Sequence, residues 1–261
     1  MTLLRLAHLS DPHLTVPLGD VAWQDWLGKR AMSRLSWARG RRLLQQPEVL
    51  AAAVADMKAQ APDHWLVTGD ITNFSLPLEF RNAAMWLGSL GAADQVSVIP
   101  GNHDALVPVP FAQGWAHWLP WMQRDDANDS ATPLPYLRVR NGVALLGLSS
   151  AVPTAPGLAS GTLGTAQLQW LAAQLPLLKS QGLFRIVLLH HPPADGVVSA
   201  RKALIPDVAK MAGISLERAN SISESVFAAG FASGPAVAAF CIPIFGIYNT
   251  FFVITAIGWV S

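Results

Sequence analysis

The stretch Val98-Ile99-Pro100-Gly101-Asn102-His103-Asp104 predicts a short apolar strand that runs into a tight turn. The turn places an amide, an imidazole and a carboxylate in consecutive positions, and in a packed core each of them would need a buried partner. A metal site has a use for all three. Asn102 offers a hard oxygen, His103 can donate a proton to a leaving group, and Asp104 can orient a neighbouring imidazole. The alternative is an ordinary Asx-rich turn.

Three further motifs follow apolar stretches that predict β-strands. The carboxyl ends of strands in an α/β sheet are where ligands bind, so the motifs are expected to meet at one edge. Taken alone, the first motif is equally well explained as a Ser-Asp-Pro turn, and a lone His at a strand end is usually a core residue. The strands are expected at residues 3–9, 65–68 and 184–189, followed by Asp11-Pro12-His13, Gly69-Asp70 and His190-His191-Pro192-Pro193.

The elements between these motifs predict an α/β fold. Helices are expected at residues 47–60 and 78–90, and a strand at 95–99 leads into the opening motif. This alternation of strands and helices is typical of α/β folds. Asn141-Gly142 predicts a hairpin between strands at 136–140 and 143–148, which adds antiparallel pairing in a mixed or second sheet. A helix is expected at 165–178, interrupted near Pro176.

The polar residues at the strand ends form a mixed oxygen and nitrogen ligand set, which suits Mn, Fe or Zn better than Ca. Asp70 is the natural bridge between two ions, which would polarise a phosphoryl group and generate a hydroxide nucleophile. His103 would then protonate the departing alkoxide. Neither Gly-x-Ser-x-Gly nor a P-loop occurs to favour another chemistry. The ligand set is Asp11, His13, Asp70, Asn102 and His190.

These motifs, in this order, resemble the calcineurin-like metallophosphoesterase family over residues 1 to about 204. The stretch His8–Leu14 and the pattern Gly161-x-x-Gly164-x-x-Gln167-Leu168-x-Trp170-Leu171 are similar to its bacterial cyclic-nucleotide-phosphodiesterase-like branch. The resemblance implies a four-layer α/β sandwich of two mixed sheets flanked by helices. It also implies a dinuclear metal centre that hydrolyses phosphomonoesters, phosphodiesters or pyrophosphates. In the family the first His of the pair is a ligand, which implies this role for His190 and leaves His191 to support the ligands.

The C-terminal part departs from the family, which closes its site with a late Gly-His-x-His, one His for each metal. No His follows His191 here, so we expect weak metal binding and impaired activity unless His191 or Asp195 completes the shell. Residues 205–261 instead predict an atypical apolar helical tail, separate from a domain at 1–204. It weakly resembles a major-facilitator transmembrane segment, and the alternatives are a buried helix pair or a fusion or frameshift. Within it a polar stretch at 207–224 precedes apolar stretches at 226–248 and 251–260.

Two tryptophan-containing segments leave alternatives open. Residues 18–46 hold Trp23, Trp26 and Trp37 with a cluster of basic residues, and no acidic residue lies between 28 and 46. They predict either a solvated amphipathic helix or a patch that faces phosphate or a membrane surface. Residues 105–133 predict either a core stripe or a cap over the site, and carry Trp115, Trp118 and Trp121. The basic residues of the first segment are Lys29, Arg30, Arg34, Arg39, Arg41 and Arg42.

Composition narrows the location and the partners. The formal net charge of the 261 residues is +1, so nucleic acid is not favoured as a partner. The single cysteine, Cys241, fits a reducing compartment, and the N-terminus lacks the features of a signal peptide. We therefore expect a cytoplasmic protein that acts on a small-molecule or nucleotide phosphoester, with membrane contact through 226–260 as the alternative. A metal- or partner-binding fragment without turnover is the second candidate function.

Overall fold

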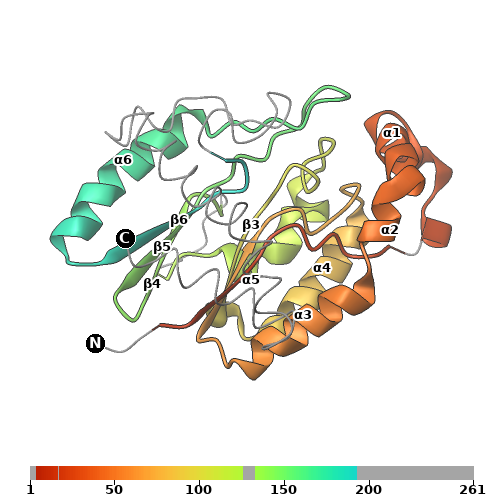
Figure 1. Ribbon diagram of the computed structural model, residues 1–261. Coiled ribbons are helices and arrows are strands. Elements are labelled where there is room, and N and C mark those ends of the chain that lie inside the picture. The colour runs from red at the N-terminus through yellow and green to blue at the C-terminus, as the bar shows by residue number, and fades with distance from the viewer. Residues whose placement is uncertain (1–3, 17, 126–132, 193–261) are drawn as a thin grey trace, which may run out of the picture.

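The computed structural model describes residues 4–16, 18–125 and 133–192, which form two three-stranded sheets flanked by helices (Figure 1). The first sheet is parallel, with β2 between β1 and β3. In the second sheet β5 pairs antiparallel with β4 and parallel with β6. The predicted α/β fold with two sheets is therefore confirmed. The strands are β1 (Leu6–Leu9), β2 (His64–Thr68), β3 (Val96–Ile99), β4 (Tyr136–Arg140), β5 (Val143–Gly147) and β6 (Phe184–Leu188).

The first sheet forms because its apolar strands are covered on both faces. All residues of β2 and β3 are buried, as expected for parallel strands with helices alongside. The helices α3 (Pro47–Ala59) and α4 (Pro77–Leu90) connect its strands, and each begins with a proline in its first turn. Proline fits there because the first helical N–H groups have no partner within the helix.

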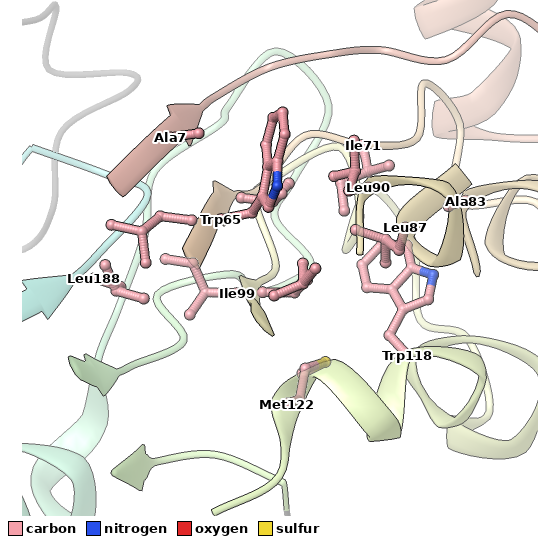
Figure 2. Packing of buried hydrophobic residues seen from close by; sticks show 14 of the residues in the cluster. Ala7, Trp65, Ile71, Ala83, Leu87, Leu90, Ile99, Trp118, Met122 and Leu188 are labelled. Atoms are coloured by element: carbon pink, nitrogen blue, oxygen red, sulfur yellow. The ribbon is translucent and has the colours of Figure 1, made fainter. Parts of the chain in front are cut away.

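The main core lies between the first sheet, α4 and the short helices η6 (Trp115–Trp118) and α5 (Leu119–Met122). Figure 2 shows Ile99 of β3 among side chains from α4 and from the 115–122 segment, with Leu188 of β6 on another side. Trp118 is fully buried, which confirms the core alternative for this tryptophan. The hydroxyl of Tyr136 donates to the carbonyl of Val98 (3.0 Å) and so ties the second sheet to the first.

The second sheet is covered by α6 (Gly164–Ser180), whose Leu168 and Leu171 pack on the sheet in a core of their own. The helix continues through Pro176, contrary to the predicted interruption. Proline removes one helical hydrogen bond, and the buried Leu171 and Leu178 hold the parts of the helix before and after it. Gln167 has a structural role at the start of this helix, because its side chain bonds both the N–H and the carbonyl of Ser149.

Strand β6 differs from the expectation of a buried strand. Phe184 is 52 % exposed and Val187 is 38 % exposed, whereas Leu188 is buried. The reason is position: β6 pairs only with β5 among the described strands and ends the order of its sheet. An apolar run alone does not distinguish such a strand from one that is covered on both sides.

Residues 18–46 form several short helices rather than one amphipathic helix. Trp26 is buried, Trp37 is half-buried and Trp23 is 70 % exposed, so the tryptophans do not share one inward face. Figure 1 places α1 and α2 at the end of the molecule opposite α6. We call residues 29–44 the basic arm. The helices of the segment are η1 (Leu18–Asp20), η2 (Trp23–Trp26), α1 (Lys29–Ser36), the π-helical η3 (Trp37–Arg41) and α2 (Arg42–Leu44).

The predicted tail at 205–261, with its three helical stretches and its possible junction, lies outside the described residues. So do Asp195 and residues 126–132 of the predicted cap. Within the described ranges, no helix has the length and apolar character needed to cross a bilayer. The remaining short helices there are η4 (Ala93–Gln95) and η5 (Phe111–Gln113).

Candidate metal centre

The candidate site lies at the carboxyl ends of the three parallel strands, where β6 also ends. Asp11 follows β1, Asp70 follows β2, Asn102 follows β3 and His190 follows β6. The turn after β1 is bonded to the turn after β2, since the N–H groups of Asp11 and His13 donate to Gly69 and Asp70 carbonyls, both at 3.0 Å. The topology therefore brings the four predicted motifs to one edge.

The backbone of this edge is unusual at the predicted ligands themselves. Asp11, His13 and Asp70 have φ values of 55°, 43° and 53°, in the left-handed region that non-glycine residues seldom adopt. Such residues persist where the surroundings enforce them, and they cluster at functional sites. Gly101 is required here, because a Cβ at this position would collide with the Asp70 carboxylate and the His190 ring.

Asp70 lies at the centre of the site and is nearly fully buried. Its Oδ2 is 3.9 Å from Nε2 of His13, and its Oδ1 is 3.6 Å from Nε2 of His190. Nε2 of His13 is also 3.9 Å from Oδ1 of Asp11, and Nε2 of His190 is 3.2 Å from Oδ1 of Asn102. All five predicted ligands are thus neighbours, and the two Asp70 oxygens face different histidines.

Two groups of donor atoms fit metal ions, and both contain Asp70. One combines Asp70 with His13 and His103, and the other combines it with Asp11 and His190. Within each group the donor atoms lie within 4.8 Å of one another. The mixture of carboxylate oxygen and imidazole nitrogen is one that divalent metal ions accept, so the residues present fit a metal site.

The three histidines of the site share one tautomer. A carbonyl oxygen can only accept, so a ring nitrogen bonded to it must carry the proton. In each case Nδ1 is that nitrogen, and the lone pair of the neutral ring is left on Nε2, the arrangement usual for histidine ligands. The acceptors are the carbonyls of Thr72 for His13 (3.2 Å), Asn73 for His103 (2.7 Å) and Thr68 for His190 (2.8 Å).

The carboxylates of the site are held in an environment that disfavours their charge. Burial, followed by the nearby charges of Asp104 and Asp11, raises the pKa of Asp70 well above its usual value. Burial also raises the pKa of Asp104. A cation between these groups would favour their ionised forms, because it supplies the opposite charge that desolvation makes valuable.

Asp104 is placed differently from the expectation that it orients an imidazole. Its carboxylate accepts backbone N–H bonds from Gly101 (2.8 Å), Thr72 (2.8 Å) and Ile71 (3.3 Å). Among the described hydrogen bonds, none joins it to a histidine ring, and the Asn73 carbonyl orients His103 instead. The side chain turns inward because three unpaired N–H groups of adjacent turns converge on it. Asp104 therefore braces the two loops that carry the ligands.

His191 is also committed elsewhere. Its Nδ1 accepts from the hydroxyl of Ser150 (2.7 Å), and its Nε2 donates to the carbonyl of Ala159 (3.0 Å). The ring is buried and packs edge-on against the ring of His190. Both of its ring nitrogens are bonded within the protein, so neither is available to complete a metal shell in this arrangement.

Glu79 is a site-supporting residue that sequence reasoning missed. Its buried carboxylate accepts N–H bonds from Asn73 (2.7 Å), Phe74 (2.9 Å) and Leu76 (2.9 Å). These bonds hold the loop whose Asn73 carbonyl orients His103. Burial raises the pKa of Glu79 to about 7. The signal in the sequence is a Glu two residues after Pro77, the position at which it can cap the start of α4.

Arg41 is the residue of the basic arm that reaches the site. Its Nη1 donates to Nε2 of His103 at 2.9 Å. Arg39 and Arg42 are exposed. The phosphate-facing alternative for residues 18–46 therefore has structural support at Arg41.

An apolar cavity of about 640 Å³ lies beside the loop that carries Asp104. Phe80, Val107, Phe111, Trp115 and Pro153 are among its lining residues. The indole N–H of Trp115 donates to the carbonyl of Asp104 (3.1 Å), which fixes the start of the 105–133 segment next to the site. This segment thus provides a wall near the ligands as well as core side chains.

Comparison with known proteins gives one result for the whole site. The model of the calcineurin-like phosphoesterase family matches residues 4–216, a range that includes every predicted ligand. The match extends past the boundary near residue 204 expected from the motifs. A search of the curated proteins found no significant match.

Proposed function

The chain belongs to the calcineurin-like phosphoesterase family, a family of metal-dependent phosphoester hydrolases, and on that premise we propose that it works with two divalent ions. The observation that carries the proposal is the position of Asp70. Its two oxygens lie 3.9 Å and 3.6 Å from the free nitrogens of different histidines, as a carboxylate that bridges two ions would require.

The donor set supports Mn, Fe or Zn as the ions. Asp11, His13 and Asp70 would hold one, and Asp70, Asn102 and His190 the other. This assignment differs from the two donor groups described above, in which Asp70 lies with His13 and His103 and with Asp11 and His190, because it reserves His103 for proton transfer. When bound, such a pair withdraws charge from phosphoryl oxygens and lowers the pKa of water. We propose phosphodiesters or phosphomonoesters of small molecules or nucleotides as substrates, and a cytoplasmic location.

His103 is proposed to move the proton that the leaving oxygen needs. Its Nδ1 is fixed on the Asn73 carbonyl, so the transfer must take place at Nε2. Burial, followed by the nearby His13, lowers the pKa of His103 to about 3, and the neutral ring accepts a bond from Arg41. His103 would therefore take up a proton from water at Nε2 and then donate that proton to the leaving oxygen.

The test is a metal count on purified protein, with Asp70→Asn as the variant. Asn keeps one neutral amide oxygen but loses the negative charge and the second oxygen that the two groups share, so the substitution should reduce two bound ions per chain to less than one and remove nearly all phosphodiester turnover. Asp94→Asn, an exposed carboxylate near β3, is the matched control and should retain both. Unchanged metal content in Asp70→Asn, with an unchanged circular dichroism spectrum, would exclude the bridge.

A catalytically impaired, metal-binding protein is the second candidate. The observation that favours it is the absence of any His after His191, where the family carries Gly-His-x-His. In the same experiment this candidate predicts ions that are easily removed by chelators and turnover that excess Mn²⁺ restores only in part. Two tightly held ions together with efficient turnover would contradict it.

A further inference from the structure

The basic arm presents one arginine to the metal centre, and we propose that Arg41 binds a phosphoryl oxygen of the substrate. The arm would then be part of the phosphate-binding site. This role rests on the proposed hydrolase function and adds to it the residue that recognises the anion. The ligand class is a phosphoryl group that carries negative charge.

The first support is the set of bonds that Arg41 makes. Nη1 donates to Nε2 of His103 (2.9 Å), and Nη2 donates to the carbonyl and hydroxyl of Ser33 (3.2 and 3.0 Å). Nε is buried and has no partner within the part of the chain that the structure describes. A guanidinium favours two parallel bonds to an oxyanion, so a neutral imidazole and an unused donor are a poor substitute for a phosphate.

The second support is that the arm is firmly held in place. Lys29 donates from Nζ to the carbonyl of Thr154 (2.9 Å) and to that of Leu158 (3.2 Å). Arg30 donates to the carbonyls of Phe74 (3.0 Å) and Ser75 (2.7 Å), in the loop that orients His103. Arg41 is thus positioned by an anchored support and not by chance contact of a long side chain.

The third support is the local backbone. Arg41 ends the π-helical turn that begins at Trp37. Such turns are rare and frequently occur at functional sites, because the wider turn redirects the side chains that follow. Trp37 packs edge-on against Phe74 with 6.0 Å between ring centroids, and its indole N–H donates to the side chain of Gln45 (2.7 Å), so the start of the turn is fixed.

Charge completes the case. Burial lowers the pKa of Arg41, and the nearby negative charge of Asp70 opposes this, so the guanidinium lies within electrostatic reach of Asp70. When ions neutralise the site carboxylates, Arg41 is left as an uncompensated positive charge in a partly desolvated place. A negatively charged phosphoryl group would compensate it.

The test measures binding of inorganic phosphate to the metal-loaded full chain by titration calorimetry. Arg41→Ala should weaken phosphate binding by about 10- to 100-fold, the range for a lost charged hydrogen bond. Arg41→Lys keeps the charge without the fork and should give an intermediate loss. Arg39→Ala removes an exposed arginine from the same arm and should change binding less than about twofold. Metal content should be equal in all four proteins.

Equal phosphate affinity in Arg41→Ala and Arg39→Ala would overturn the role of Arg41, as would a metal-loaded parent that binds no phosphate. If Arg41→Ala fails to fold, Arg41→Lys decides, because parental affinity in that folded variant would exclude bidentate recognition. Phosphodiester turnover separates this role from the proposed function. Phosphate binding that depends on Arg41 in a protein without turnover would leave Arg41 assigned and the hydrolase excluded.

Discussion

His103 is the residue whose chemistry the site defines most closely. One ring nitrogen is tied to the Asn73 carbonyl, and the other faces the ligand groups and Arg41. A proton donor matters most when the leaving group is poor. His103→Ala should therefore reduce kcat for alkyl phosphodiesters by about 100-fold or more, and for activated aryl esters by much less. Measuring both substrates with the same variant controls for a general loss of active protein. An equal loss of kcat on both would exclude the proton-transfer role of His103.

At this scale the sequence identified side chains that follow strands, because the carboxyl ends of neighbouring strands must meet. Asp11, Asp70 and His190 belong to this class. The sequence could not identify hydrogen-bond partners that depend on the rotamer of a side chain. Asp104 lies next to His103 in sequence, yet its carboxylate points to backbone N–H groups and not to a ring. Arg41 could not be separated from Arg39, because both carry the same charge in the same basic run.

At the scale of elements, the start of α4 supports the site through Glu79. At pH 8, above the pKa of about 7 that burial gives it, Glu79 is an ionised acceptor for the N–H groups of the 73–76 loop. Glu79→Gln would turn an amide N–H₂ toward those donors. We expect a loss of about 2 kcal/mol in the free energy of unfolding at pH 8.

Urea unfolding at pH 8 measures this loss. Glu48→Gln is the matched control, since Glu48 lies in the first turn of α3 after Pro47 but is exposed. It should change stability by less than about 0.5 kcal/mol. A Glu79→Gln protein as stable as the parent would show that the loop does not depend on this carboxylate.

Elements with a strong local signal were predictable, and those without one were not. α3 and α4 combine an initial proline with apolar positions at helical spacing, and both occur as expected. The basic arm has no such period, because its pieces are short and include a π-helical turn. Its place is set by bonds from Lys29 and Arg30 to carbonyls far away in sequence.

At the scale of the whole molecule, His64 links stability to pH. It is fully buried in β2, with Nε2 bonded to the Ser97 hydroxyl (2.8 Å), and burial followed by Arg140 lowers its pKa to about 4. In the unfolded chain the pKa is about 6.5. The stability that the neutral His64 side chain contributes is fully present above pH 6.5. It is lost as the pH drops toward 4, because in that range the unfolded chain takes up a proton that the folded chain does not.

At pH 5 this proton uptake lowers the free energy of unfolding by about 2 kcal/mol relative to neutral pH. Urea unfolding at pH 7.5 and pH 5 should therefore show a smaller loss on acidification for His64→Gln than for the parent, by about that amount. Gln keeps a polar partner for Ser97 without a group that titrates. The same loss in both proteins would mean that His64 does not contribute to acid sensitivity.

The global architecture was predictable because it follows from strand order and turn chemistry. Parallel strands with helical connections predict an α/β fold, and Asn141-Gly142 predicts a hairpin in a mixed or second sheet. The resemblance to the family implied the second sheet, which the structure has. The exposure of β6 could not be predicted, because the same apolar stretch is compatible with an interior strand or an edge strand. Pairing across a sheet is a property of distant segments, which no local pattern contains.

The anchoring of the basic arm has a consequence for how such a protein can change over generations. The donors are specific side chains, Lys29 and Arg30, but most of the acceptors are main-chain carbonyls, which every amino acid possesses. A substitution at an acceptor position such as Leu158 leaves the main-chain carbonyl in place. A substitution at Lys29 or Arg30 removes the donor and therefore the hydrogen bond. Selection for phosphate binding would therefore act on the side chains of the basic arm, and the residues that supply only main-chain acceptors would be free to vary.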